Sequence, residues 1–156
     1  MTKDQQFASA RKLQQPTAAA ATAFEAGQEA MAAELNRRML ARPDLDRLIG
    51  SDNRAMMENN SRNFMRFMAS LLQGYEPTVL VETALWVFRA YRSHGFHTSY
   101  WPANLDTAVQ IIKEELTPDV FGEVYPFFDW LIVNIPAFVL LSDEALEAGT
   151  SHGHDF

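Results

Sequence analysis

Apolar residues recur along most of the chain at spacings of three and four positions, which is the period of an amphipathic α-helix. In the segment that begins after Pro16, the large apolar residues share one stripe: Phe24, Met31, Leu35 and Met39. No segment alternates apolar and polar residues for long enough to predict a strand, and no Asn-Gly or Asp-Gly pair marks a hairpin. We therefore expect an all-α protein with six to seven helices.

Proline, glycine and capping residues divide this pattern into segments. Thr17 is a typical N-cap, and Pro43 stops the long helix that follows it. Gly27 lies on the apolar stripe of that helix and would let another helix approach closely. After a short turn of sequence DLDRLIG, three more helices are expected, over residues 51–74, 78–93 and 102–116. Unequal helices joined by tight corners predict a globin-like packing of crossed helices.

The last helix is expected over residues 118–147 and is apolar nearly all round, with kinks at Pro126 and Pro136. Its most apolar stretch, WLIVNIPAFVLL, is shorter than the roughly 20 residues that a membrane-spanning helix needs. We therefore expect a core helix and no membrane insertion. In domain terms, residues 1–15 form an arm or short helix, residues 16–147 one helical domain, and residues 148–156 a flexible tail.

Composition narrows the class of protein. Apolar residues make up 47% and aromatic residues 12% of the chain, which excludes disorder for most of it. The chain has no cysteine, which excludes disulfides, thiolate zinc sites and iron–sulfur clusters. Its net charge is −7 and its basic residues are scattered, so we expect no nucleic-acid binding. The first residues contain no apolar signal segment, so we expect a cytoplasmic protein.

The densest set of polar and aromatic side chains is the segment RAYRSHGFHTSYW, residues 89–101. His94 and His97 have a spacing that can bind a metal or haem, but Gly95 between them is expected to end the helix, so they need not face one side. Histidines at a helix C-terminus more commonly interact with nearby carbonyl groups. We expect no metal site here, nor at the tail pair His152 and His154.

Asn60 lies four residues before Phe64 and is expected to face inward with it. A buried amide needs hydrogen-bond partners, which can belong to a neighbouring helix or to a ligand. The chain contains no Gly-x-Ser-x-Gly motif, no phosphate-binding glycine loop and no second carboxylate placed to act with Asp129. We therefore expect no enzymatic activity.

Two sequence motifs mark the beginning and the end of the helix expected over residues 78–93. An apolar helix ends in a glycine and an acidic turn, LLQGYEP, and a long helix then leads into VFRAYRSHGFHTSYWP. With these motifs, residues 53–116 resemble the central part of bacterial sensor globins. Aligning Gly95 with the glycine of that family puts Tyr91 where the haem-ligating histidine would stand.

The resemblance implies a globin-like domain that has lost haem. Such domains are similar to the haem-free amino-terminal parts of stressosome proteins and to small sporulation-inhibitory sensors, some of which accommodate fatty acids. These relatives dimerise through their last two long helices. In this chain the corresponding helices are 102–116 and 118–147, and the apolar character of the second also favours a homodimer.

We therefore expect a non-enzymatic, globin-like sensor or binding domain without a cofactor, with an apolar cavity for a small hydrophobic ligand between the helices that carry Phe64 and Trp86. A signalling protein is the expected partner. The expected ligand-binding residues are Asn60, Phe64, Phe67, Trp86, Tyr91, Arg92, His94 and Trp101. Arg92 or His94 would supply the counter-charge for a carboxylate-headed lipid.

Two alternatives remain open. The first is a haem protein in which His94, His97 or Tyr91 is the axial ligand. The second is a structural interaction module whose helix 118–147 docks a larger protein.

Overall fold

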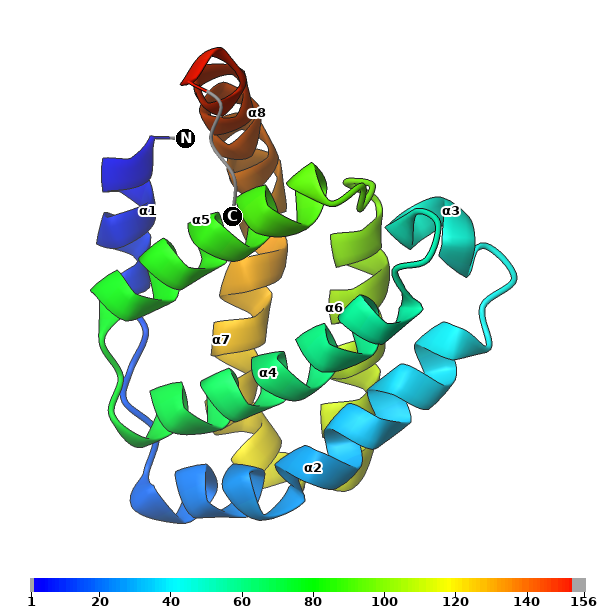
Figure 1. Cartoon of the computed structure of the whole chain (residues 1–156). Helices are drawn as coiled ribbons and strands as arrows, with labels where there is room; N and C mark the ends of the chain where they lie inside the picture. Colours follow the sequence, from blue (N-terminus) through cyan, green and yellow to red (C-terminus); the bar gives the residue numbers. More distant parts are fainter. Residues whose placement is uncertain (1, 153–156) are drawn as a thin grey trace.

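The structure, a computed structural model, describes residues 2–152, and it describes side chains as far as Glu144. Within these residues it contains helices and no strand (Figure 1). The helices are α1 (Lys3–Ala10), α2 (Ala18–Leu40), α3 (Leu45–Ile49), α4 (Arg54–Gln73), α5 (Pro77–Ser93), α6 (Tyr100–Glu115), α7 (Pro118–Val133) and α8 (Ile135–His152). The all-α class is as predicted, but this part of the chain forms eight helices where six to seven were expected.

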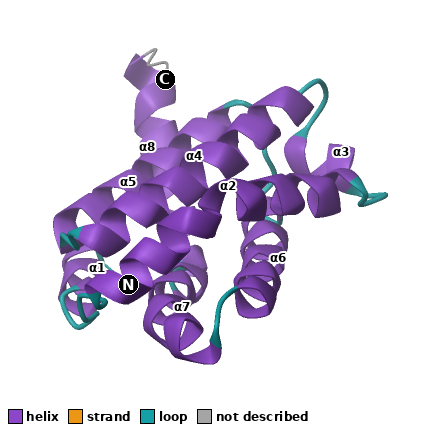
Figure 2. Ribbon diagram, turned by 90° about the horizontal axis from the view of Figure 1, so that it is seen from below, coloured by secondary structure: helices purple, strands orange, loops and turns teal. Residues whose placement is uncertain are grey.

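The helices form two layers that cross each other (Figures 1 and 2). One layer holds α2, α4 and α5 side by side, and α6 and α7 run behind it in a different direction. Helix α2 packs closely against α4 and α6, whereas α5 packs mainly against α1 and α8. Consecutive helices α4 and α5 are therefore held by different neighbours, which leaves room between them.

The largest departure from expectation is the break between α7 and α8. The expected kink near Pro136 is present, since the chain bends by 45° between the two helices, but the expected continuous helix over 118–147 is wrong, because it is interrupted at Asn134. Pro136 has no N–H, and its ring clashes with the carbonyl group four residues earlier. Asn134 is the C-cap of α7: its backbone N still donates to the carbonyl oxygen of Trp130 at 3.1 Å, and its Nδ2 donates to the same oxygen at 2.8 Å. Pro126, by contrast, lies inside α7 without ending it.

In the described part of the chain, no single helix combines the length and the hydropathy that crossing a bilayer requires. Helices α7 and α8 as far as Glu144 reach that threshold only when the bent pair is taken together.

Helix α1 belongs to the body of the protein. Gln6 and Ala10 are fully buried, and the Trp130 indole nitrogen donates to Ser9 Oγ at 2.9 Å. The Tyr75 hydroxyl group donates to the carbonyl oxygen of Ala10 at 2.6 Å. At the other end, the backbone of α8 continues as helix to His152, so part of the predicted tail is helical; residues 153–156, with His154, lie outside the described residues.

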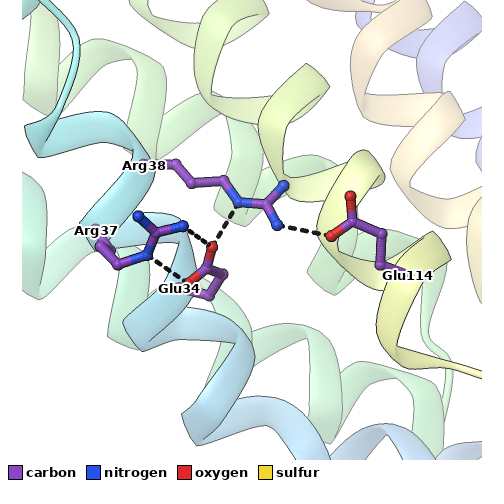
Figure 3. A network of polar contacts seen from close by, with 4 residues as sticks. All are labelled: Glu34, Arg37, Arg38 and Glu114. Atoms are coloured by element: carbon purple, nitrogen blue, oxygen red, sulfur yellow. Dashed lines mark hydrogen bonds and ion pairs between the residues drawn. The ribbon is translucent and has the colours of Figure 1, made fainter.

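A polar network connects α2 to α6 at the surface (Figure 3). Glu34 accepts from Arg37 and Arg38, and Arg38 also donates to Glu114 on α6 at 2.6 Å. Hydrogen bonds from the two arginines lower the pKa of Glu34 to about 2. Arg37 and Glu114 are exposed and Glu34 and Arg38 are half-buried, so solvent screens these ion pairs and each contributes little to stability.

Candidate ligand-binding site

A cavity of about 250 Å³ lies between α4 and α5. Its walls come from four helices: Asn60, Asn63, Phe64 and Phe67 of α4; Leu80, Thr83, Ala84, Trp86, Val87, Phe88 and Tyr91 of α5; Trp101, Asn104 and Leu105 of α6; and Leu131 of α7. Most of these side chains are apolar or aromatic, which is the usual lining of a small-molecule site.

Burial of the lining residues shows which way the cavity opens. Asn63 of α4 is exposed and Trp86 of α5 is 51% exposed, so these side chains lie at the rim. Leu105 of α6 and Leu131 of α7 are buried and form the floor. The mouth is thus the gap between α4 and α5, and the second layer closes the inner end.

The floor also carries a buried polar cluster. Asn60 of α4 and Asn104 of α6 each donate from Nδ2 to the hydroxyl oxygen of Tyr100, both at 3.1 Å. Tyr100 is fully buried, and burial raises the pKa of its hydroxyl group, so it stays a neutral phenol. The cluster links the two layers at the deep end of the cavity.

Aromatic rings form the wall beside this cluster. Trp101 stacks on Phe88 with ring centres 4.7 Å apart, and meets Tyr100 edge-on at 4.8 Å and Tyr91 edge-on at 5.9 Å. Phe88 also contacts Phe138 of α8 at 5.0 Å. The wall therefore connects the cavity to α8. The Trp101 indole nitrogen is buried and has no hydrogen-bond partner among the described residues.

The structure brings together most of the residues that the sequence suggested. Those that line the cavity are Asn60, Phe64, Phe67, Trp86, Tyr91 and Trp101. Their role in binding stays a prediction. The expected position of the cavity, between the helices that carry Phe64 and Trp86, matches the position of the cavity in the structure.

Arg92 does not line the cavity. The expectation that it supplies the counter-charge for a ligand is therefore wrong. Its Nη1 atom donates to Ser142 Oγ at 2.9 Å and to the carbonyl oxygen of Val139 at 3.3 Å, and it forms an ion pair with Asp143. All three partners lie on α8, on the side of α5 away from α4. Arg92 attaches α8 to the body and offers no charge to a ligand between α4 and α5.

The histidines of this region also lie outside the cavity. His94 caps the C-terminal end of α5 and is exposed; its carbonyl oxygen accepts from Asn53 Nδ2 at 2.8 Å. His97 is exposed too, and its Nδ1 accepts from the backbone N of Ser99 at 3.0 Å. The structure therefore supports the reading that these side chains belong to a helix end and loop. Within the described residues, no three metal-binding side chains of the His, Cys, Asp or Glu type come together.

The residues around the cavity do not fit haem. Of the three candidate axial ligands, only Tyr91 lines the cavity. Tyrosine binds haem iron as the phenolate, whereas burial raises the pKa of Tyr91 and favours the protonated phenol. His94 and His97 would each have to move inward from the surface.

Sequence reasoning missed Tyr100 and Asn104 as parts of the site. A signal was present, because Asn104 falls on the same helical stripe as Trp101, Ala108 and Ile112, at spacings of three and four. A polar residue on such a stripe is buried and needs partners. The sequence of α6 alone does not show that Asn60 of α4 binds the same Tyr100 hydroxyl group.

No protein-family model, curated protein or solved structure matches this chain.

Proposed function

We propose that this protein is a non-enzymatic, globin-like sensor or binding domain that takes up a small hydrophobic ligand in the cavity between α4 and α5. The observation that carries the proposal is the cavity itself, about 250 Å³ of space with largely apolar walls and an opening at Trp86. A concave, largely apolar pocket with a few polar groups is the usual form of a small-molecule site.

The volume indicates the size of the guest. A cavity of about 150 Å³ lined by apolar side chains holds benzene, whereas drug-sized molecules occupy roughly 300–1,000 Å³. At about 250 Å³, the cavity between α4 and α5 suits a molecule somewhat larger than a single ring. A long fatty acid would have to extend through the mouth.

The globin-like part of the proposal rests on helix arrangement. A globin packs eight crossed helices around its pocket. Here eight helices in the described residues form two crossed layers, and the cavity lies between two successive helices within the stretch 53–116 that resembles sensor globins.

We also propose a homodimer, formed through α7 and α8 with the edge of α6. Two large apolar side chains of the bent pair are exposed, Val133 of α7 by 61% and Leu140 of α8 by 51%. Large apolar patches on a protein surface commonly mark an interface, and these two residues would be its apolar contacts. The outer side of α6 is polar, with Asp106 and Gln110 exposed, so α7 and α8 would supply the apolar contact.

Sedimentation analysis tests the dimer. Val133→Glu and Leu140→Glu should each yield a monomer, whereas Val79→Glu, at an exposed apolar position on α5, should leave the dimer intact. A wild-type chain that sediments as a monomer would contradict the dimer and favour the alternative, in which this surface docks a different protein.

Calorimetric titration with ethylbenzene tests the cavity. Binding to the wild-type protein is expected, and Ala84→Phe should abolish it because the new ring fills the cavity. Leu85→Phe is the matched control, since Leu85 is the next residue of α5 and does not line this cavity. Equal binding by both variants, or no binding by the wild type, would overturn the proposal.

A further inference from the structure

The walls of the cavity carry no ionised side chain. The polar residues among them are amides, a threonine, and aromatic residues with a neutral hydroxyl or indole group. Arg92, the basic residue expected to serve here, is paired with Asp143 on the other side of α5. A charged group buried without a partner is strongly disfavoured, so the deep end of this cavity disfavours a carboxylate.

The floor nevertheless offers hydrogen bonds. A carboxamide has two N–H donors and an acceptor oxygen. Asn60 and Asn104 each use one donor on the hydroxyl oxygen of Tyr100, and no described residue hydrogen-bonds to the Oδ1 atom of either. The two side chains are 5% and 1% exposed, and both line the cavity, so a molecule inside it can approach their amide groups.

An unpaired amide acceptor beside an unpaired amide donor complements a small uncharged group that both donates and accepts hydrogen bonds. A hydroxyl group donates one hydrogen bond and accepts others, so it can satisfy both atoms of one amide or bridge the two amides. The rest of the wall is apolar and aromatic, and it complements a compact hydrocarbon body.

We infer that the ligand is an uncharged hydroxyl compound, a phenol or an alcohol of similar size, whose hydroxyl group hydrogen-bonds to Asn60 and Asn104 at the floor of the cavity. This inference rests on the proposed function, because it assumes that the cavity binds a ligand. It assigns the two amides the task of orienting the guest, with its hydrocarbon end toward Trp86 at the rim.

Three probes that share one body test the inference: 4-ethylphenol, ethylbenzene and 4-ethylbenzoate. Calorimetric titration of the full chain at neutral pH should give an affinity for 4-ethylphenol about tenfold higher than for ethylbenzene, as one net hydrogen bond provides. The benzoate should bind at least tenfold more weakly than the phenol, because its charge would be buried without a partner.

Leucine variants then identify the groups responsible. Asn60→Leu and Asn104→Leu keep the approximate side-chain volume and remove the amide. Each should reduce the preference for the phenol over ethylbenzene to about twofold or less, while binding of ethylbenzene is retained and reports an intact cavity. If one variant does not fold, the other still tests the assignment. Asn59→Leu is the control, because it makes the same substitution at an exposed position of α4 that does not line the cavity, and it should keep the full preference.

The outcomes separate the inference from the proposed function. Equal wild-type affinity for the phenol and ethylbenzene would overturn the inference and leave the apolar site standing. Tighter binding of the benzoate would overturn it as well, as would a preference that survives in both leucine variants. If none of the three probes binds, the proposed function itself fails.

Discussion

Gly50, between α3 and α4, passes so close to Gly95, after α5, that a Cβ atom on Gly50 would lie 3.1 Å from the Gly95 carbonyl oxygen. Both residues have positive φ, +81° and +100°. Beside this contact, Asn53 Nδ2 donates to the carbonyl oxygens of Ile49 and His94, at 2.7 and 2.8 Å. The contact holds the end of α5 against the start of α4, so it sets one end of the gap in which the cavity lies.

Gly50→Ala should therefore destabilise the protein by about 2 kcal/mol, since it combines backbone strain with a close contact to backbone that cannot give way. Thermal unfolding followed by circular dichroism measures the change. Gly27→Ala is the control. Gly27 lies inside α2, and a Cβ there would meet only the end of the Met31 side chain, at 3.6 Å. This control should be stabilised by roughly 0.5–1 kcal/mol. An unchanged melting temperature for Gly50→Ala would show that the contact is not tight.

Trp86 should report ligand entry by its fluorescence. It is 51% exposed at the rim, whereas Trp101 and Trp130 are buried. Acrylamide should quench mainly Trp86, and Trp86→Phe should remove the quenchable, red-shifted part of the emission. In the wild-type protein, added ethylbenzene should shift the emission of Trp86 to shorter wavelength and protect it from acrylamide. Ligand-induced protection that persists unchanged in Trp86→Phe would contradict a mouth at this residue.

Alkaline pH should destabilise the fold through Tyr75. Burial raises the pKa of its hydroxyl group from 10.0 to about 12, and the pKa of Tyr100 is raised as well. The native state therefore holds these protons more tightly than the unfolded chain. Their contribution is fully present below pH 10 and is lost as the pH rises through about 12. Urea unfolding at a series of pH values should show stability falling from about pH 10 upward.

Tyr75→Phe separates the contribution of this residue. The variant should be less stable at neutral pH, because the hydrogen bond from Tyr75 to the Ala10 carbonyl oxygen is lost, at a cost of about 1 kcal/mol. Its stability should also fall less steeply above pH 10. A slope identical to that of the wild type would assign the alkaline loss to other groups.

Arg92→Met should loosen α8 from α5. The Arg92 side chain is 21% exposed and holds Val139, Ser142 and Asp143 of α8 together, so we expect a loss of about 1–3 kcal/mol. Hydrogen exchange should then rise first in α8. Arg37→Met is the control, because Arg37 is 68% exposed in its ion pair and should lose less than about 1 kcal/mol. Loss of ligand affinity without loss of stability in Arg92→Met would restore Arg92 to the binding site.

Local signals in the sequence predicted several elements correctly. Thr17 caps α2, and its side chain accepts from the backbone N–H of Ala20. The stripe of Phe24, Met31, Leu35 and Met39 is buried as expected. These features depend on residues within one or two turns of each other, and such information is contained in a short stretch of chain.

Other expectations failed because they depended on distant neighbours. Gly27 was expected to admit a close helix, yet a Cβ there would meet only Met31 of its own helix. Arg92 was expected to serve a ligand, yet its partners Ser142 and Asp143 lie on α8, far along the chain. In both cases the packing of other helices around the residue decides the outcome.

Helical periodicity, caps and breakers determined from the sequence alone that this chain is all-α and which side of each helix is apolar. Only the tertiary structure decided that Tyr91 lines a cavity while Arg92, the next residue, binds α8. Successive residues on a helix point about 100° apart, so one faces α4 and the next another neighbour. Which neighbour stands on each side depends on how whole helices pack, and that is why Asn60, Tyr100 and Asn104 became one cluster only when the two layers met.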